Sequence, residues 1–121
     1  MMRNVFEHSG VDKVYVCAQF WPKHQLVEIA IADMGCGINS VMSRKFKGKE
    51  LQMLILSMFP GISAGSYFSW FNDDNVFKNS GYGLYITKEL ALAYDGSFML
   101  CSGNYALNYN TKGSTYRKKR L

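Results

Sequence analysis

Residues 27–38 read VEIAIADMGCGI, an apolar run that leads directly into a carboxylate and two glycines. The part from Leu26 to Ala32 is nearly continuous in apolar side chains, which predicts a strand near the centre of a sheet. Asp33 places one charge where that strand ends, and Gly35 and Gly37 allow the backbone to turn sharply and to approach another molecule closely. Asp and Gly are also ordinary turn residues, so this segment alone predicts either a ligand site or a plain turn.

The composition is that of one compact domain. The chain has 121 residues, of which 48% are hydrophobic and 15% aromatic, and this is enough for a single core. The longest strongly apolar run, Leu51 to Phe59, is far shorter than the roughly 20 residues that a membrane span requires. The first residues lack the pattern of a signal peptide. Three cysteines without paired spacing predict reduced thiols in the cytoplasm rather than a zinc site or a disulfide framework.

The positive charge is concentrated at the end of the chain. The formal net charge is +5, and four of the 14 basic residues are consecutive at 117–120. Without them the rest of the chain is nearly neutral, which argues against a broad polyanion-binding surface and against nucleic acid as a partner. The tail itself is expected to be a solvated end, with a contact to nucleic acid, lipid headgroups or an acidic partner as the alternative.

Strands and helices are expected along most of the chain. A helix is expected to end at residues 4–8, because Ser9 and Gly10 follow it. Strands are predicted from the apolar pattern at residues 11–21, 26–32, 97–101 and 105–109, with the start of one more at 112–116. Helices are predicted at residues 48–59 and 84–94, ended by Pro60-Gly61 and Asp95-Gly96.

Residues 61–82 form a long predicted connection that is rich in serine and asparagine. Four exposed-looking aromatic residues lie within it, at Tyr67, Phe68, Trp70 and Phe71. Loops of this length inside a compact domain are usually functional. We predict a lid that folds over a ligand, with a partner-docking surface as the alternative.

The segment 79–84, NSGYGL, opens the predicted helix at 84–94. Glycines at a helix N-terminus leave backbone N–H groups accessible, and these donors together with the positive end of the helix dipole favour a phosphate group. Close packing of the helix is the alternative explanation of the two glycines.

Four segments, in this order along the chain, resemble the motifs of the Bergerat-fold (GHKL) ATPases, the superfamily of gyrase, heat-shock chaperone, histidine kinase and mismatch-repair ATP-binding domains. Residues 4–9 resemble the end of the N box, 33–38 the first glycine box, 79–84 the second and 113–115 the third. The resemblance covers nearly the whole chain. Asn4 and His8, followed by a serine, most resemble the histidine kinase and anti-sigma serine kinase branch.

The resemblance implies a pocket for ATP and Mg²⁺. In this family Asn4 would bind Mg²⁺ through its amide oxygen, an atom type that this hard cation prefers. Asp33 would accept a hydrogen bond from the exocyclic amine of adenine, which selects adenine over guanine. The base would lie against the backbone of the first glycine box, at Gly35, Gly37 and Ile38.

The later motifs contain the residues that the resemblance implies for binding the phosphate groups and for supporting the adenine base. The residues implied to face the phosphates are Lys78, Gly81, Tyr82, Gly83 and Leu84. Thr115 resembles the family residue that supports adenine recognition through water and hydroxyl contacts. Simpler interpretations exist for some of these residues: Asn4 is also typical of a helix end, and His8 of a structural histidine.

The motifs leave the catalytic residues unknown. In gyrase-like and chaperone-like members the water-activating glutamate lies one helical turn before the N-box asparagine, and here that position would fall before Met1. Glu7 shares a helix face with Asn4 but is not assigned the role of the base. We therefore expect residues 1–116 to be a partial histidine kinase-like ATP-binding domain, incomplete at its N-terminus, followed by the basic tail at 117–121.

The expected fold is an α/β (α+β) two-layer sandwich, with a mixed, mainly antiparallel sheet and helices on one face. The expected function is ATP and Mg²⁺ binding in a histidine kinase-like or anti-sigma-like cytoplasmic protein, which transfers a phosphoryl group to a protein partner or substrate. Catalysis of that transfer is mainly positioning and charge neutralisation. The alternatives are a gyrase-like or chaperone-like ATPase that dimerises, and a non-catalytic nucleotide-binding interaction module.

Overall fold

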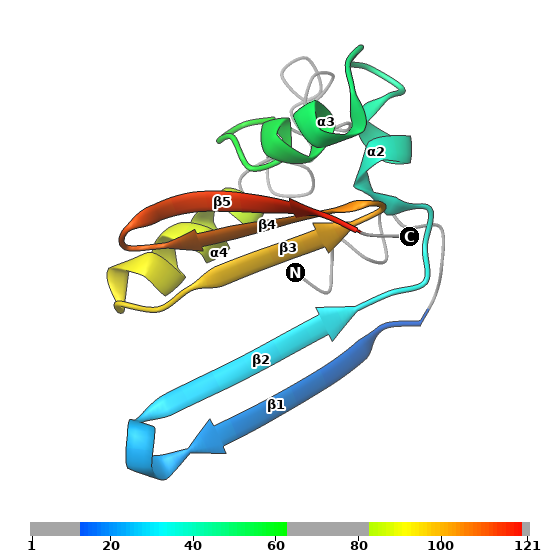
Figure 1. Cartoon of the computed structure of the whole chain (residues 1–121). Coiled ribbons are helices and arrows are strands. Elements are labelled where there is room, and N and C mark those ends of the chain that lie inside the picture. Colours follow the sequence, from blue (N-terminus) through cyan, green and yellow to red (C-terminus); the bar gives the residue numbers. More distant parts are fainter. Residues whose placement is uncertain (1–12, 63–82, 120–121) are drawn as a thin grey trace, which may run out of the picture. The chain divides into compact units, whose positions relative to one another are not determined.

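The computed structural model describes residues 13–62 and 83–119 (Figure 1). The chain divides into two compact units, unit 1 (Met1–Cys36) and unit 2 (Gly37–Leu121). The described strands form a two-stranded and a three-stranded sheet, both antiparallel. The protein is therefore a small α+β protein, and the prediction of one mixed sheet is wrong for the described residues. None of the helices that the structure describes is long and apolar enough to cross a membrane.

Unit 1 is a β-hairpin in its described part. Strand β1 (Tyr15–Trp21) pairs with β2 (Leu26–Ala32), and the 3₁₀ turn η1 (Pro22–His24) joins them. Gln25 completes the turn in the left-handed region, at φ 48°. The predicted strand at 26–32 is confirmed with the same bounds, but β1 begins four residues later than the predicted strand at 11–21. Because β2 pairs only with β1 among the described strands, its predicted central position is wrong there.

The register of the hairpin explains the error about β2. One face is wholly apolar and consists of three cross-strand pairs: Val16 with Ile31, Ala18 with Ile29, and Phe20 with Val27. On the other face Gln19 lies opposite Glu28, and β2 otherwise contributes Leu26 and two alanines. Side chains alternate between the faces of a strand. The apolar continuity of β2 thus came from one strongly apolar face plus small alanines, which is typical of a strand with one covered face.

Unit 2 contains three described α-helices and the three-stranded sheet. The elements in chain order are α2 (Gly37–Met42), α3 (Glu50–Leu56), α4 (Gly83–Ala93), β3 (Phe98–Ser102), β4 (Tyr105–Asn110) and β5 (Gly113–Lys118). The helices predicted at 48–59 and 84–94 are confirmed, with somewhat different ends, whereas α2 was not predicted. Strand β5 includes Arg117 and Lys118, so the boundary expected between domain and tail at 116/117 falls inside a strand.

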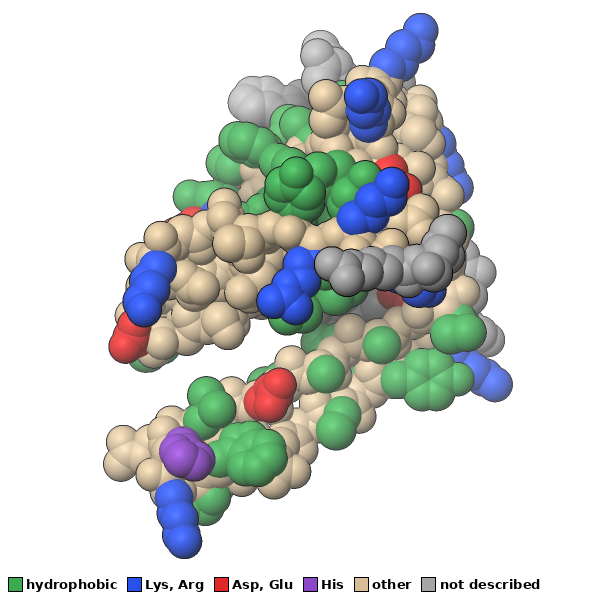
Figure 2. All heavy atoms as spheres, viewed as in Figure 1, with side chains coloured by type: hydrophobic (Ala, Val, Ile, Leu, Met, Phe, Trp, Pro, Cys, Tyr) green, Lys and Arg blue, Asp and Glu red, His purple; other side chains and the backbone are tan. Residues whose placement is uncertain are grey.

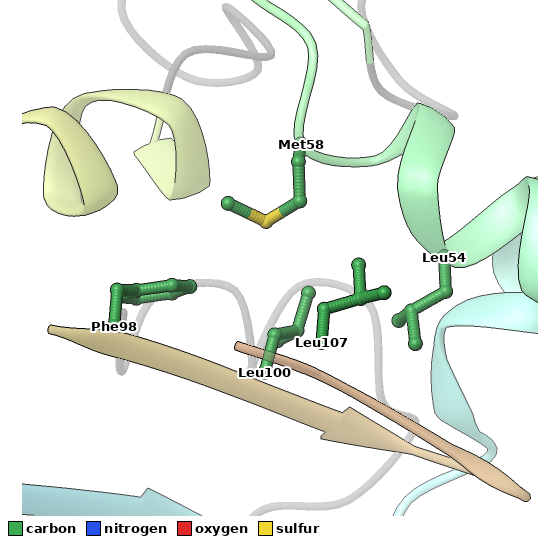
Figure 3. Packing of buried hydrophobic residues seen from close by; sticks show 5 residues of the cluster. All are labelled: Leu54, Met58, Phe98, Leu100 and Leu107. Atoms are coloured by element: carbon green, nitrogen blue, oxygen red, sulfur yellow. The ribbon is translucent and has the colours of Figure 1, made fainter. Parts of the chain in front are cut away.

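The core of unit 2 lies between its helices and one face of the sheet. Its buried residues are Leu54, Met58, Phe98, Leu100 and Leu107, and Figure 3 shows their side chains pointing toward one another. Leu84 and Ala91 of α4 pack against the same cluster. Helices α3 and α4 therefore cover the same face of the sheet, and unit 2 has the two-layer arrangement that the sequence predicts.

The C-terminal end of α4 is closed by a Schellman motif. The N–H of Gly96 donates to the carbonyl of Ala91 at 2.8 Å, and the N–H of Asp95 donates to the carbonyl of Leu92 at 3.0 Å. Asp95 adopts φ 59° at the position that glycine usually occupies. A Cβ at Gly96 would lie 2.9 Å from the carbonyl oxygen of Ala91. Glycine is therefore required at 96, whereas Asp95 carries a backbone penalty.

Replacing Asp95 by glycine should stabilise the protein. Glycine adopts the left-handed region without steric cost, so Asp95→Gly is expected to raise the free energy of unfolding by about 0.5–1 kcal/mol. Asp95→Ala should lower it, because alanine tolerates this region less well than aspartate. Urea unfolding followed by circular dichroism measures both changes. Equal stability of the glycine and alanine variants would contradict a backbone penalty at position 95.

A hydrogen-bonded clamp joins the start of α3 to the turn between β3 and β4. The carboxylate of Glu50 accepts from the backbone N–H of Asn104 at 2.6 Å and from its side-chain amide at 3.1 Å. Gly103, at φ 59°, passes so close to Glu50 that a Cβ would collide with the carboxylate. The two bonds from Asn104 stabilise the charged form and hold the pKa of Glu50 below its ordinary value of 4.5.

The clamp predicts a pH-dependent contribution to stability. Because the pKa of Glu50 is lowered in the folded state, its contribution is present above pH 4.5 and is lost as the pH falls through the folded value. Glu50→Gln should therefore destabilise the protein near neutral pH, and the difference from wild type should shrink in acid. Urea unfolding of both proteins between about pH 7 and pH 3 measures this.

Glu89→Gln is the matched control for the clamp. Glu89 forms an ion pair with its neighbour Lys88 at 2.9 Å, and its side chain is 49% exposed. Because Glu89 is about half exposed and pairs with a neighbouring lysine rather than with a backbone N–H, its charge should contribute less to stability than that of Glu50. The role assigned to the charged carboxylate would be contradicted if the free energies of unfolding of wild type and Glu50→Gln differed by the same amount at every pH.

Candidate functional site

Asp33 lies immediately after β2, and its side chain is exposed. Its Oδ1 atom accepts a hydrogen bond from the backbone N–H of Gly35 at 2.7 Å. This bond orients the carboxylate at the end of the strand. A carboxylate has two acceptor oxygens, so Oδ2 can accept from a donor outside the chain. Residues 33–35 thus form an Asx turn that leaves one oriented acceptor oxygen on an exposed side chain.

Gly37 has a structural role that is independent of any ligand. It begins α2 with φ 81°, a conformation that favours glycine, and a Cβ there would lie 3.2 Å from the hydroxyl oxygen of Ser102. The same hydroxyl accepts from the backbone N–H of Ile38 at 2.9 Å. Ser102 therefore satisfies one of the N–H groups that the first turn of a helix leaves without a partner.

Gly83 is the first residue of α4, and Leu84 packs against the core of unit 2. The hydroxyl of Thr87 donates to the carbonyl of Gly83 at 2.8 Å, inside the first turn. The first four N–H groups of this 11-residue helix have no intrahelical acceptor, and its first turn holds no acidic side chain. The helix dipole adds positive potential at this end. The start of α4 is therefore suited to a phosphate group.

Thr115 lies on the other face of the sheet from the core. In the register of β4 and β5, Thr115 is opposite Asn108, whereas its neighbour Tyr116 is opposite the buried Leu107. Side chains of successive strand residues point to opposite faces. Within unit 2, Thr115 is thus on the sheet face away from Leu84, and β5 does not bring it to the start of α4.

Four of the predicted site residues lie outside the described residues: Asn4, Lys78, Gly81 and Tyr82. The same holds for His8 and for the aromatic part of the predicted lid. Among residues 13–62 and 83–119 no group of three His, Cys, Asp or Glu side chains could hold a metal ion.

The predicted site residues that the structure describes fall into three groups: Asp33 and Gly35 in unit 1, those at the starts of α2 and α4 in unit 2, and Thr115 on β5. In unit 1, Asp33 and Gly35 are joined by a hydrogen bond. In unit 2, Ile38 follows Gly37 into α2 and packs against the same core cluster as Leu84. Ile38 and Leu84, which end the two predicted glycine boxes, therefore pack against one core, while Thr115 faces away from it.

Ser102 is a residue that the sequence does not reveal as part of this region. It lies in the predicted turn between two strands, and the residue it caps is 64 positions away. No local pattern marks such a partner, because a side-chain cap from a distant strand depends on how the helix packs on the sheet.

Comparison with known proteins gives no match: no family model, no curated protein and no solved structure is significantly similar to this chain.

Proposed function

We propose that this protein binds ATP with Mg²⁺ through a Bergerat-type pocket, as a histidine kinase-like or anti-sigma-like cytoplasmic protein. It passes the γ-phosphoryl group to a side chain of a protein partner. The four motifs in family order, at residues 4–9, 33–38, 79–84 and 113–115, are the basis of this proposal.

The observation that carries the proposal is the oriented carboxylate of Asp33. The bond from the Gly35 N–H is that of an Asx turn, which fixes Oδ1 at the strand end and leaves Oδ2 of an exposed side chain for a ligand. In this proposal Oδ2 accepts from the amine of adenine, and Gly35 leaves room for the base against the backbone. Guanine presents a carbonyl at the corresponding position, which a carboxylate repels, so the pocket selects adenine.

In this proposal the phosphates bind at the start of α4, as the resemblance of residues 79–84 to the second glycine box implies. The N–H groups and dipole of the helix favour negative charge, and Gly83 leaves no side chain at the first helical position. Asn4 holds the Mg²⁺ ion in this proposal, through its amide oxygen. The chain contributes binding, orientation and charge neutralisation, which are the main components of phosphoryl-transfer catalysis.

Titration of the full chain with a fluorescent ATP analogue, with and without Mg²⁺, tests the proposal. We expect saturable binding that Mg²⁺ strengthens, with Asn4→Ala reducing the Mg²⁺ effect and Gly83→Ala weakening binding in either condition. Absence of saturable binding would refute ATP binding in any form. Binding with phosphate release in the absence of a protein acceptor would favour an ATPase, and binding without loss of the γ-phosphate to any acceptor would favour a non-catalytic module.

A further inference from the structure

The charge of the protein is unevenly divided between the two units. Unit 1 has three basic and four acidic residues, whereas unit 2 has eleven basic and five acidic residues, a formal net charge of +6. The composition of the whole chain hides this division, because four consecutive basic residues at 117–120 account for most of the net positive charge. Seven of the basic residues form two groups: Arg44, Lys45, Lys47 and Lys49 between α2 and α3, and Arg117, Lys118 and Lys119 at the end of β5.

The fold of unit 2 brings these two groups to one corner. Glu50, which follows Lys49, accepts two hydrogen bonds from Asn104. The carbonyl of Asn104 in turn accepts from the backbone N–H of Lys119 at 2.7 Å. Lys118 lies opposite Tyr105 in the sheet. The clamp at the turn between β3 and β4 therefore joins the basic connection to the basic strand end, although about 70 residues separate them in sequence.

Acidic side chains are few in the described part of unit 2, and only Glu50 lies at this corner, where its charge interacts with that of Lys118. The acidic residues of the described part are Glu50, Glu89 and Asp95. Both oxygens of Glu50 are engaged by Asn104, Glu89 pairs with Lys88, and Asp95 closes the C-terminal end of α4. Figure 2 shows Lys and Arg side chains over the connection between α2 and α3 and beside the end of β5. All seven basic residues of the two groups are exposed.

An exposed aromatic ring stands beside these cations. Tyr116 is 60% exposed, and its ring centroid lies 6.5 Å from that of Tyr105. Tyr116 and Lys118 are two residues apart on β5 and share the sheet face that carries the core, about 7 Å apart along the strand. A ring with a cation at this spacing can stack one base while the ammonium group binds a phosphate.

We propose that this corner of unit 2 binds single-stranded nucleic acid, with Lys47, Lys49, Lys118 and Lys119 on the phosphates and Tyr116 stacked on a base. The combination of a positive surface that follows the backbone and an aromatic platform is how sequence-tolerant single-strand binding works. The site uses no residue that is assigned to the proposed ATP pocket. It assigns a partner that the near-neutral composition of the chain without its tail had argued against.

Fluorescence anisotropy with a labelled 20-nucleotide oligothymidine and the full chain tests this site. The double variant Lys47→Gln with Lys118→Gln removes one cation from each group, and Lys112→Gln at the turn between β4 and β5 is the matched control. We expect the double variant to lose about tenfold in affinity and to lower the slope of log K against log salt by about 1.4. Lys112→Gln should stay within about twofold of wild type, because Lys112 lies at the other end of β5.

Tyr116→Leu separates stacking from charge. It should weaken binding by about fivefold or more without changing the salt slope. The proposal is overturned by loss of affinity in Lys112→Gln equal to that in the double variant, or by no detectable oligonucleotide binding. It is also overturned if polyglutamate or anionic vesicles bind to the protein more tightly than the oligonucleotide does. Displacement of the oligonucleotide by ATP, at a concentration that saturates ATP binding, would overturn it as well. Circular dichroism and urea unfolding of each variant confirm that the fold is retained.

Discussion

Leu54→Ala is expected to lower the free energy of unfolding by about 3 kcal/mol, the largest stability effect predicted for this protein. Leu54 is 2% exposed and lies at the centre of the cluster that joins α3 to β3 and β4. Truncation to alanine removes buried methyl and methylene groups and leaves a cavity against Leu100 and Leu107. A loss of this size is a large part of the stability of a domain this small.

Ile55→Ala is the matched control for the core prediction. Ile55 is the next residue on α3 and is 38% exposed, so its truncation should cost clearly less, about 1 kcal/mol. Urea unfolding of both variants, followed by far-ultraviolet circular dichroism, gives the comparison. Equal losses would mean that Leu54 does not anchor the helix layer to the sheet.

Asp33→Asn is expected to weaken ATP binding by about 10- to 100-fold, because a hydrogen bond to a charged group is worth about 1.5–3 kcal/mol. Asparagine is nearly the same size but offers a neutral carbonyl oxygen or an amide donor. The amide can also donate to the carbonyl of guanine. We therefore expect the preference for ATP over GTP to narrow in this variant, in addition to the loss of affinity for ATP.

Asp95→Asn carries the same chemical change far along the chain, at the C-terminal end of α4, and should leave nucleotide affinity unchanged. Competition of ATP and GTP against the fluorescent analogue measures both affinities for each variant. If wild type binds ATP and Asp33→Asn binds it equally well, the carboxylate does not recognise the base. That outcome would mean that the protein binds ATP at a site that does not include Asp33.

Local patterns were sufficient to predict most of the elements. Leu26–Ala32 and Tyr105–Asn110 were predicted as strands to within one residue, because apolar residues of the right kind are bounded there by clear turn residues. Helix α2 was missed because six residues are too few to show a helical period. The N–H of Ile38 in its first turn donates to the hydroxyl of Ser102, which lies 64 residues further along the chain. No local sequence pattern predicts such a contact.

The predicted start of the C-terminal tail was based on charge and differs from the end of β5 in the structure. Consecutive basic residues suggested a solvated tail from 117, but β5 continues through Arg117 and Lys118. An edge strand needs only one partner, and lysine is well tolerated on it because charge discourages further pairing. The hydrogen-bonded register with β4, rather than side-chain polarity, decides where the strand ends.

The sequence by itself determined the strands, the two longer helices and the position of Asp33 at a strand end, because each depends on residues a few positions apart. Only the tertiary structure decided which face Thr115 occupies, since a shift of one residue in pairing would move it to the other face. It likewise decided that Glu50 and Lys119 both form hydrogen bonds with Asn104. Side chains distant in sequence become neighbours only through the packing of α3 on the sheet, and no short-range pattern carries that information.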